Sequence, residues 1–283
     1  MPQPEPACPY RRLTSATTAT ITSAAVPITD KMYFVRMARA TVLVCLFFRL
    51  LAAAPLHAQS SDGASPVGTT ETLYAPRNTW GIFGEFSPDS SHIFLGTAQQ
   101  RRLLMFGGEY AHRFHAGRFV AMDYLVQARP VILESDPALV GFRNLATGQI
   151  EFPIPPHRVQ IIDRTHFFEG PGNVVVPFYT RQWTYAGGLN PLGLKINFRT
   201  RHRVQPVVTA AAGFIISRRD IPIDHAAAFN FSFELGGGLE WFFQTHRSFR
   251  LDYRVHNISN ANTGTHNPGI DSGLFQLTYS FGK

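Results

Sequence analysis

The chain contains only two cysteines and no apolar run long enough to form a transmembrane helix. Cys8 and Cys45 both lie in the first 58 residues, so the rest of the chain has no thiol for a disulfide or a cysteine-ligated metal. A spanning helix needs about 20 mostly apolar residues. The apolar stretch at 40–54 is shorter and is interrupted by Arg49. These absences exclude a disulfide scaffold and disfavour a helical membrane anchor.

The first 58 residues have the features of a leader with a secretory signal. Met32 opens a segment with two early arginines, which is followed by the apolar stretch and a small-residue cleavage pattern that ends at Ala58. Residues 1–31 have no place in such a signal, and the sequence therefore suggests a true start at Met32 or Met37. Residues 59–78 are polar and predict a linker to the folded part at 79–283.

The basic character of the chain comes largely from this leader. The formal net charge is +7. The leader carries six basic and two acidic residues, so the remaining chain is close to +3. Its basic residues are scattered along the chain instead of clustered. Charge therefore gives no support for a nucleic-acid partner.

From about Thr79 onward, apolar and polar residues alternate with a period of two, and no helix period appears. The alternation is clear at 118–129, 228–235 and 275–281. An outer-membrane barrel with an apolar outside and a polar inside shows this dyad pattern. A soluble sandwich with an apolar inside would show it too, so alternation alone does not choose between them.

The lengths of the connections favour the barrel. Short turns and long loops alternate along the chain, as they do in an outer-membrane barrel with its long loops outside. The longest connection, at 130–179, contains a Pro-rich piece at 152–156 and is predicted to form an extracellular cover. The sequence thus predicts an all-β fold, an eight-stranded antiparallel transmembrane barrel in the cell outer membrane. The expected strands are 79–87, 103–115, 118–129, 180–199, 204–217, 227–244, 248–258 and 271–281.

A barrel of eight strands has an interior that side chains fill, so a general porin is not expected. Charged residues of the strands should form ion pairs inside it, among them Glu109, Arg113, Asp123, Glu234 and Glu240. His112 and His115 do not predict a metal site, since residues i and i+3 of a strand point to opposite faces. No metal and no cofactor is expected. A closed barrel also needs no partner to cover its edges.

Strand parity gives each polar residue near the chain's end a direction. In the strand at 248–258, Leu251 and Tyr253 should face lipid, and Asn257 and Ser259 share their parity. His256 should point inward. Polar residues on a lipid-facing wall are costly unless they serve a function. On propensity alone, the same residues would be a polar strand exit followed by an ordinary turn.

These polar residues belong to a recognisable pattern. Tyr253-Arg-Val-His-Asn257-Ile-Ser259-Asn260-Ala261 is followed by Asn267-Pro268-Gly269-Ile270-Asp271. In this pattern, and over roughly Val204 to Phe281, the chain resembles the PagL-like lipid A 3-O-deacylases, and the resemblance is weaker upstream of Val204. That resemblance implies an eight-stranded outer-membrane barrel that hydrolyses an ester-linked acyl chain of lipopolysaccharide on its outer surface.

Carried onto this chain, the resemblance implies a site made of a nucleophile, a base and an acid. Ser259 would be the nucleophile and Asp271 the acid that orients the base. Asn260 would help to hold the oxyanion. Asn267 and Gly269 would complete the binding side of the site. The base should stand at position 257, where this chain has Asn257.

A serine hydroxyl needs a base to remove its proton, and an amide cannot do so at neutral pH. Three hypotheses remain open. His256 could serve through a one-residue slip or bulge at the strand end. His266 could reach back from the last loop. Alternatively, the chain is an inactive relative that binds lipid or has a structural role.

Overall fold

The computed structural model describes residues 74, 76–90, 92–168, 170 and 172–282. The expected leader at 1–58 and most of the expected linker lie outside the described residues. Among the described residues, no helix has the length and hydropathy needed to cross a bilayer.

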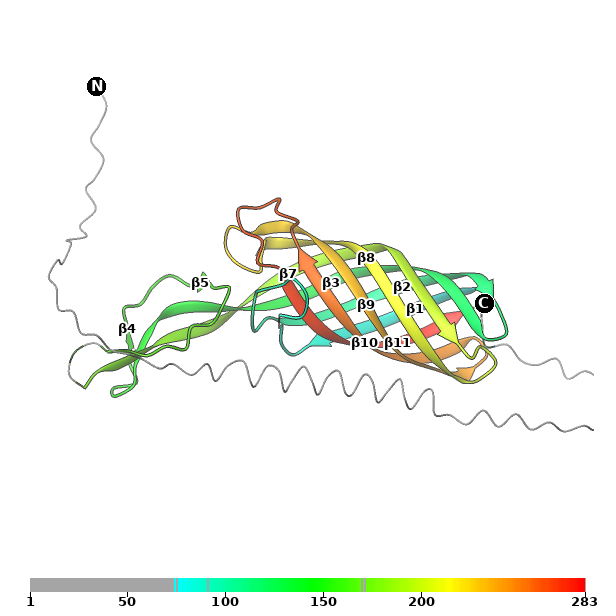
Figure 1. Ribbon diagram of the computed structural model, residues 1–283, viewed down its shortest axis with the longest axis horizontal. Coiled ribbons are helices and arrows are strands. Elements are labelled where there is room, and N and C mark those ends of the chain that lie inside the picture. The colour runs from blue at the N-terminus through cyan, green and yellow to red at the C-terminus, as the bar shows by residue number, and fades with distance from the viewer. Residues whose placement is uncertain (1–73, 75, 91, 169, 171, 283) are drawn as a thin grey trace, which may run out of the picture. The chain divides into compact units, whose positions relative to one another are not determined.

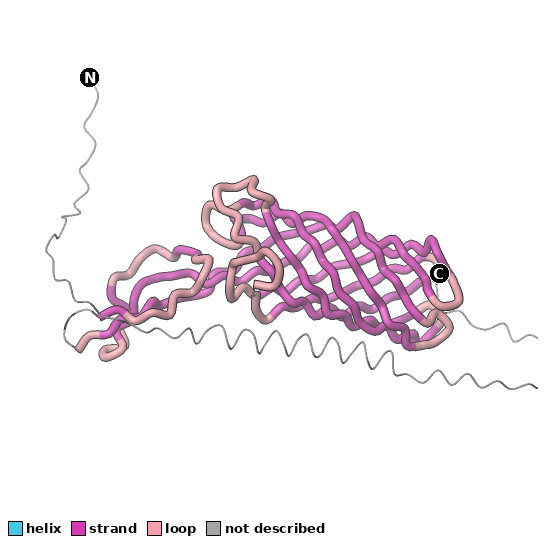
Figure 2. Tube along the Cα trace, in the orientation of Figure 1, coloured by secondary structure: helices cyan, strands magenta, loops and turns pink. Residues whose placement is uncertain are grey.

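Eight long strands form a closed antiparallel ring (Figures 1 and 2). The strands are β1 (Asn78–Ser87), β2 (Arg102–Ala116), β3 (Val120–Asn144), β7 (Val174–Phe198), β8 (Val204–Ile221), β9 (Ala227–Gln244), β10 (Arg247–Ser259) and β11 (Ile270–Gly282). Each long strand pairs with the next long strand along the chain, including β3 with β7, and the ring closes between β1 and β11. The predicted fold class and strand number are confirmed.

The connections differ sharply between the two ends of the barrel. At one end, the turns span only 117–119, 199–203 and 245–246. At the other end, the connections are 88–101, 145–173, 222–226 and 260–269. We call these the short-turn end and the long-loop end. The alternation of short and long connections expected from the sequence is therefore present.

The connection between β3 and β7 is shorter than the sequence predicts, because both strands are longer than expected. β3 and β7 continue well past the other strands, and the connection between them is 145–173 instead of 130–179. The two strands form a long hairpin that projects at the long-loop end (Figure 1). Pro130 is accommodated at a register shift between Arg129 and Ile132, and bulges are places where strands tolerate proline. The short strands β4 (Ile150–Glu151), β5 (His157–Arg158) and β6 (Phe167–Phe168) lie in the connection, and β4 and β5 flank its Pro-rich piece.

The two faces of the barrel wall follow the parity expected from the sequence. In β10, Leu251 and Tyr253 are exposed, whereas Arg250, Asp252 and Arg254 are buried. The same alternation places an apolar, aromatic-rich surface outside, where it can face lipid.

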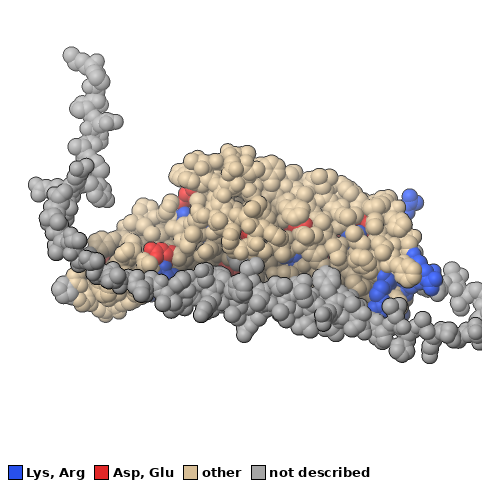
Figure 3. Space-filling view, viewed as in Figure 1, with Lys and Arg blue, Asp and Glu red and all other residues tan. Residues whose placement is uncertain are grey.

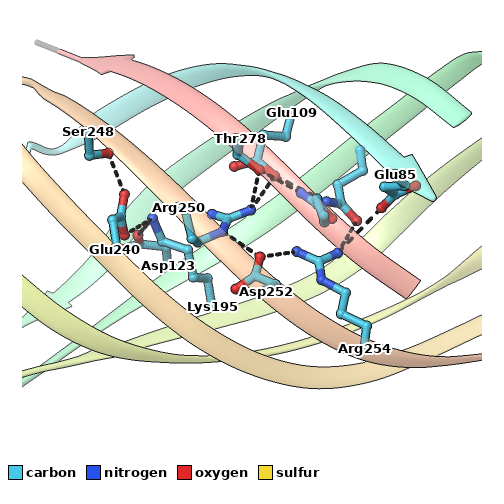
Figure 4. A network of polar contacts seen from close by, with 12 residues as sticks. Glu85, Glu109, Asp123, Lys195, Glu240, Ser248, Arg250, Asp252, Arg254 and Thr278 are labelled. Atoms are coloured by element: carbon cyan, nitrogen blue, oxygen red, sulfur yellow. Dashed lines mark hydrogen bonds and ion pairs between the residues drawn. The ribbon is translucent and has the colours of Figure 1, made fainter. Parts of the chain in front are cut away.

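Inside, charged side chains fill the barrel with linked ion pairs (Figure 4). Arg250 contacts both Glu109 and Asp252, and Arg254 contacts Asp252 and Glu234. The expected participants all take part, because Arg113 pairs with Asp123, and Lys195 with Asp123 and Glu240. Buried charges are tolerated when they are paired in this way, and the network occupies the space that a pore would need.

A segment of the long connection covers the mouth of the barrel. Buried Arg101 donates hydrogen bonds to the carbonyl oxygens of Val159 and Gln160 and to Asp136. Arg158 binds Asp224 with Nη2 2.7 Å from Oδ1. Partial burial opposes ionisation of Asp224, but the hydrogen bonds and charge of Arg158 hold the pKa of this carboxyl below its usual value. The segment around Arg158 is thus fastened across the long-loop end.

Candidate active site on the outer wall

The candidate site is built where β10 and β11 end at the long loops. The two strands pair without a register shift from Arg247 to Ile258, which sets Asn257 directly opposite Asp271. Asn257 Nδ2 donates to Asp271 Oδ1 at 2.6 Å. Ser259 lies two residues further along β10 and so shares the outward face of Asn257. An outward-facing Ser, Asn and Asp are therefore gathered as the sequence expects.

Asp271 also fixes the 88–101 loop. Its Oδ2 accepts backbone N–H groups of Ile93, Phe94 and Gly96 at 3.1, 2.5 and 2.9 Å. A Cβ at Gly96 would lie 2.4 Å from the backbone nitrogen of Asp271, so only glycine allows this close approach. The loop covers Asp271, which is fully buried despite its outward parity. Phe94 and Leu95 are left exposed beside the site.

Ser259 is held by the turn that follows β10. Its Oγ donates to Asn267 Oδ1 at 3.1 Å, and Asn267 Oδ1 also accepts the backbone N–H of Asn260 at 3.2 Å. Asn260 Nδ2 donates to the carbonyl oxygen of His266 at 2.7 Å. Gly269, at φ 60°, completes the turn, and its carbonyl oxygen accepts the N–H of Ala98. In this structure, the side-chain amides of Asn260 and Asn267 thus hold the turn and the serine.

The structure does not bring His256 to Ser259. His256 is fully buried inside the barrel, where its Nε2 lies 2.9 Å from Ser232 Oγ and 3.8 Å from Glu234 Oε1. β10 shows a register shift only at its first residues, between Arg247 and Ser248. The one-residue slip that would turn His256 outward is therefore absent, and the prediction that His256 serves as the base is wrong in this structure.

His266 lies in the 260–269 loop and is exposed. Its described contact with the site is made by its backbone carbonyl, not by its ring. No side chain that could act as a base is in hydrogen-bond contact with Ser259 among the described residues. In the same part of the chain, no group of three or more metal-ligating side chains is found.

Two parts of the site were not anticipated from the sequence. One is the 88–101 loop on Asp271, a contact between residues some 175 positions apart. The other is Tyr253, whose hydroxyl would lie 2.3 Å from a Cβ at Gly273. The phenol thus lies across Gly273, two residues from Asp271. A glycine within an alternating strand indicates such a close approach, but it does not identify the partner.

Replacing Asp271 with Ala is expected to release the 88–101 loop, because three backbone N–H groups lose their acceptor. Amide hydrogen exchange at 93–96 should rise by at least about tenfold, since the loss of one such hydrogen bond is worth about 1.5–3 kcal/mol. Asn257→Ala removes the other partner of Asp271 and is the matched control. Equal exchange in both variants would contradict the assigned role.

The closed ring, the apolar outer wall and the polar filled interior define an eight-stranded barrel of the bacterial outer membrane. Residues 166–280 match the family model of lipid A 3-O-deacylase (PagL), and the chain is similar to this family in that region, which contains the site residues expected from the sequence.

Solved structures of outer-membrane barrels are similar to the chain. The outer membrane enzyme PagL aligns at 12% identity over 72% of this chain and 99% of its own, with a TM-score of 0.44. Neisserial surface protein A aligns at 8% identity over 73% and 97%, with a TM-score of 0.38. Outer membrane protein OprG from Pseudomonas aeruginosa aligns at 11% identity over 74% and 98%, with a TM-score of 0.35. No curated protein matches the sequence.

Proposed function

We propose that this protein binds lipid A-type glycolipids in the outer leaflet with its β10–β11 surface, and that it hydrolyses their esters far more slowly than a complete triad would. One observation carries the proposal. Asn257 lies opposite Asp271 and two residues before Ser259 on the same face of β10, and it donates to Asp271 Oδ1 at 2.6 Å, as the base of a triad would.

The match to the lipid A 3-O-deacylase model supports the choice of ligand, since it spans both strands of the site. The surroundings suit an acyl chain. A shallow groove of about 220 Å³ runs over the outer wall and is lined mainly by apolar side chains, including Phe86, Phe106, Leu251 and Phe275. Leu251 lies six residues from Asn257 on the same face of β10, which corresponds to about 20 Å along the strand.

The expected weakness of hydrolysis follows from proton transfer. Attack by Ser259 on an ester carbonyl requires its hydroxyl proton to leave, and a neutral amide has no basic lone pair to accept it. In serine hydrolases, loss of the base costs several orders of magnitude in rate. Under this proposal, the protein has the ligand-binding surface and a serine in the position of the nucleophile, but it lacks the group that would accept the proton of the serine.

Incubation of the purified barrel with lipopolysaccharide tests both halves of this proposal. Lipid A masses measured afterwards should be unchanged, and lipopolysaccharide in mixed micelles should still bind. Ser259→Ala is the control for chemistry. Loss of one ester-linked acyl chain that disappears in Ser259→Ala would overturn the claim of slow hydrolysis, and absence of binding would overturn the glycolipid assignment.

A second candidate function is lipid A deacylation with His266 as the base. It is favoured by the position of this residue in the turn that holds the nucleophile, because its neighbour Asn267 accepts the hydrogen bond of Ser259. In this case the wild-type protein removes an acyl chain, and His266→Ala abolishes the reaction as completely as Ser259→Ala. Activity that survives His266→Ala would exclude this candidate.

A further inference from the structure

The exposed charges of the barrel are distributed unequally between its two ends. Six exposed arginines lie at the short-turn end, where the barrel's basic side chains form a patch on the face seen in Figure 3. We call them the basic collar: Arg77, Arg118, Arg199, Arg201, Arg203 and Arg247. They come from the residue before β1, from two of the three short turns and from the start of β10, so they are spread around the rim.

No described carboxylate is exposed at this end of the barrel. The acidic residues nearest to it, Glu109, Asp123 and Glu240, are buried in the interior, where arginine and lysine partners already neutralise them. The exposed acidic residues Asp89 and Asp163 lie in connections of the long-loop end. The exposed charged side chains that the structure describes at this end are therefore all basic.

The collar lies next to the aromatic edge of the lipid-facing wall. Exposed Phe119 follows Arg118, and exposed Phe198 precedes Arg199. The guanidinium carbon of Arg118 is 5.5 Å from the ring centroid of Phe119. Aromatic residues gather at the membrane–water interface, and arginine binds phosphate with a fork of N–H donors. This position places the guanidinium groups at the depth of lipid headgroups.

We propose that the basic collar binds the phosphates of anionic glycerophospholipids in the leaflet at the short-turn end. The site is separate from Ser259, which lies at the opposite end of the barrel, and the proposal does not depend on activity there. Each arginine near an anionic surface adds attraction that salt screens, so the collar fixes the depth and orientation of the barrel in its membrane.

The test is lipid selectivity in reconstituted vesicles. The full chain is placed in vesicles of equimolar phosphatidylglycerol and phosphatidylcholine, and spin-labelled forms of both lipids report their relative association with the barrel. The collar variant is Arg118→Gln/Arg199→Gln/Arg203→Gln/Arg247→Gln. The matched control removes four exposed arginines from the other end of the barrel: Arg102→Gln/Arg164→Gln/Arg218→Gln/Arg219→Gln.

The wild type and the control variant should prefer phosphatidylglycerol. The collar variant should lose this preference by about tenfold or more, and the corresponding four-lysine variant should keep it because the charge remains. No preference in the wild type, or an equal loss in both glutamine variants, overturns the proposal. The proposal is also overturned if the collar variant loses lipopolysaccharide binding but keeps its preference for phosphatidylglycerol. Heat-modifiable migration reports folding, and two double variants replace the quadruple one if it does not fold.

Discussion

Asn257→His is expected to give the barrel ester-hydrolase activity on lipopolysaccharide. The new imidazole would stand opposite Asp271, which already accepts a hydrogen bond from this position at 2.6 Å. Its second nitrogen could then take the proton of Ser259, on the same outward face. The rate should rise by on the order of 10³-fold or more, since loss of a triad member costs at least that much. Loss of one acyl mass from lipid A is the measurement.

Three control variants make this gain interpretable. Asn257→His/Ser259→Ala should return the rate to that of the wild type, because the nucleophile is gone. Asn257→Gln keeps an amide and should not gain activity. Asn257→His/Asp271→Asn should lose most of the gain, because the imidazole is no longer oriented by a carboxylate. A gain that persists without Ser259 would mean that the outer-wall site is not where the ester is cleaved.

The barrel could be predicted from the sequence because its wall obeys a local rule. Parity alone places Leu251 and Tyr253 outside and Arg254 and His256 inside, and the structure agrees. The extension of β3 beyond Pro130 could not be predicted in this way. Prolines normally argue against a strand interior, and a register shift that accommodates one depends on the partner strand.

The candidate site could be predicted from the sequence only in part, because strand parity is a local rule and the loop contacts are not. Asn257 and Ser259 lie on one strand, so their common face follows from parity. The burial of Asp271 does not, since it depends on the 88–101 loop, whose residues around Gly96 carry no period. The direction of His256 follows from an unbroken register, and the sequence alone left a bulge open. Long-range contacts therefore decide which of the candidate groups can react.

The largest loss of stability is expected from Arg129→Met in the interior network. Arg129 Nε and Nη2 lie 2.7 and 2.8 Å from the two carboxylate oxygens of Glu85, and Nη2 lies 2.7 Å from Glu234. All three side chains are about 99% buried or more. Among the described residues, removing the shared cation leaves Glu85 with Arg254, at 4.0 Å, as its remaining ion-pair partner. Breaking a buried pair costs about 3–5 kcal/mol, measurable as a lower free energy of unfolding in lipid vesicles.

The compensating variant separates an unpaired charge from a lost packing contact. Arg129→Met/Glu85→Gln removes one charge of each sign and should recover most of the lost stability, because an uncharged replacement of a buried pair is often close to neutral. Glu85→Gln alone leaves Arg129 with Glu234 and completes a double-mutant cycle. If Arg129→Met costs less than about 1 kcal/mol, the interior is hydrated and the network does not fill the barrel. If the double variant is no more stable than Arg129→Met, packing and not charge holds this part of the interior together.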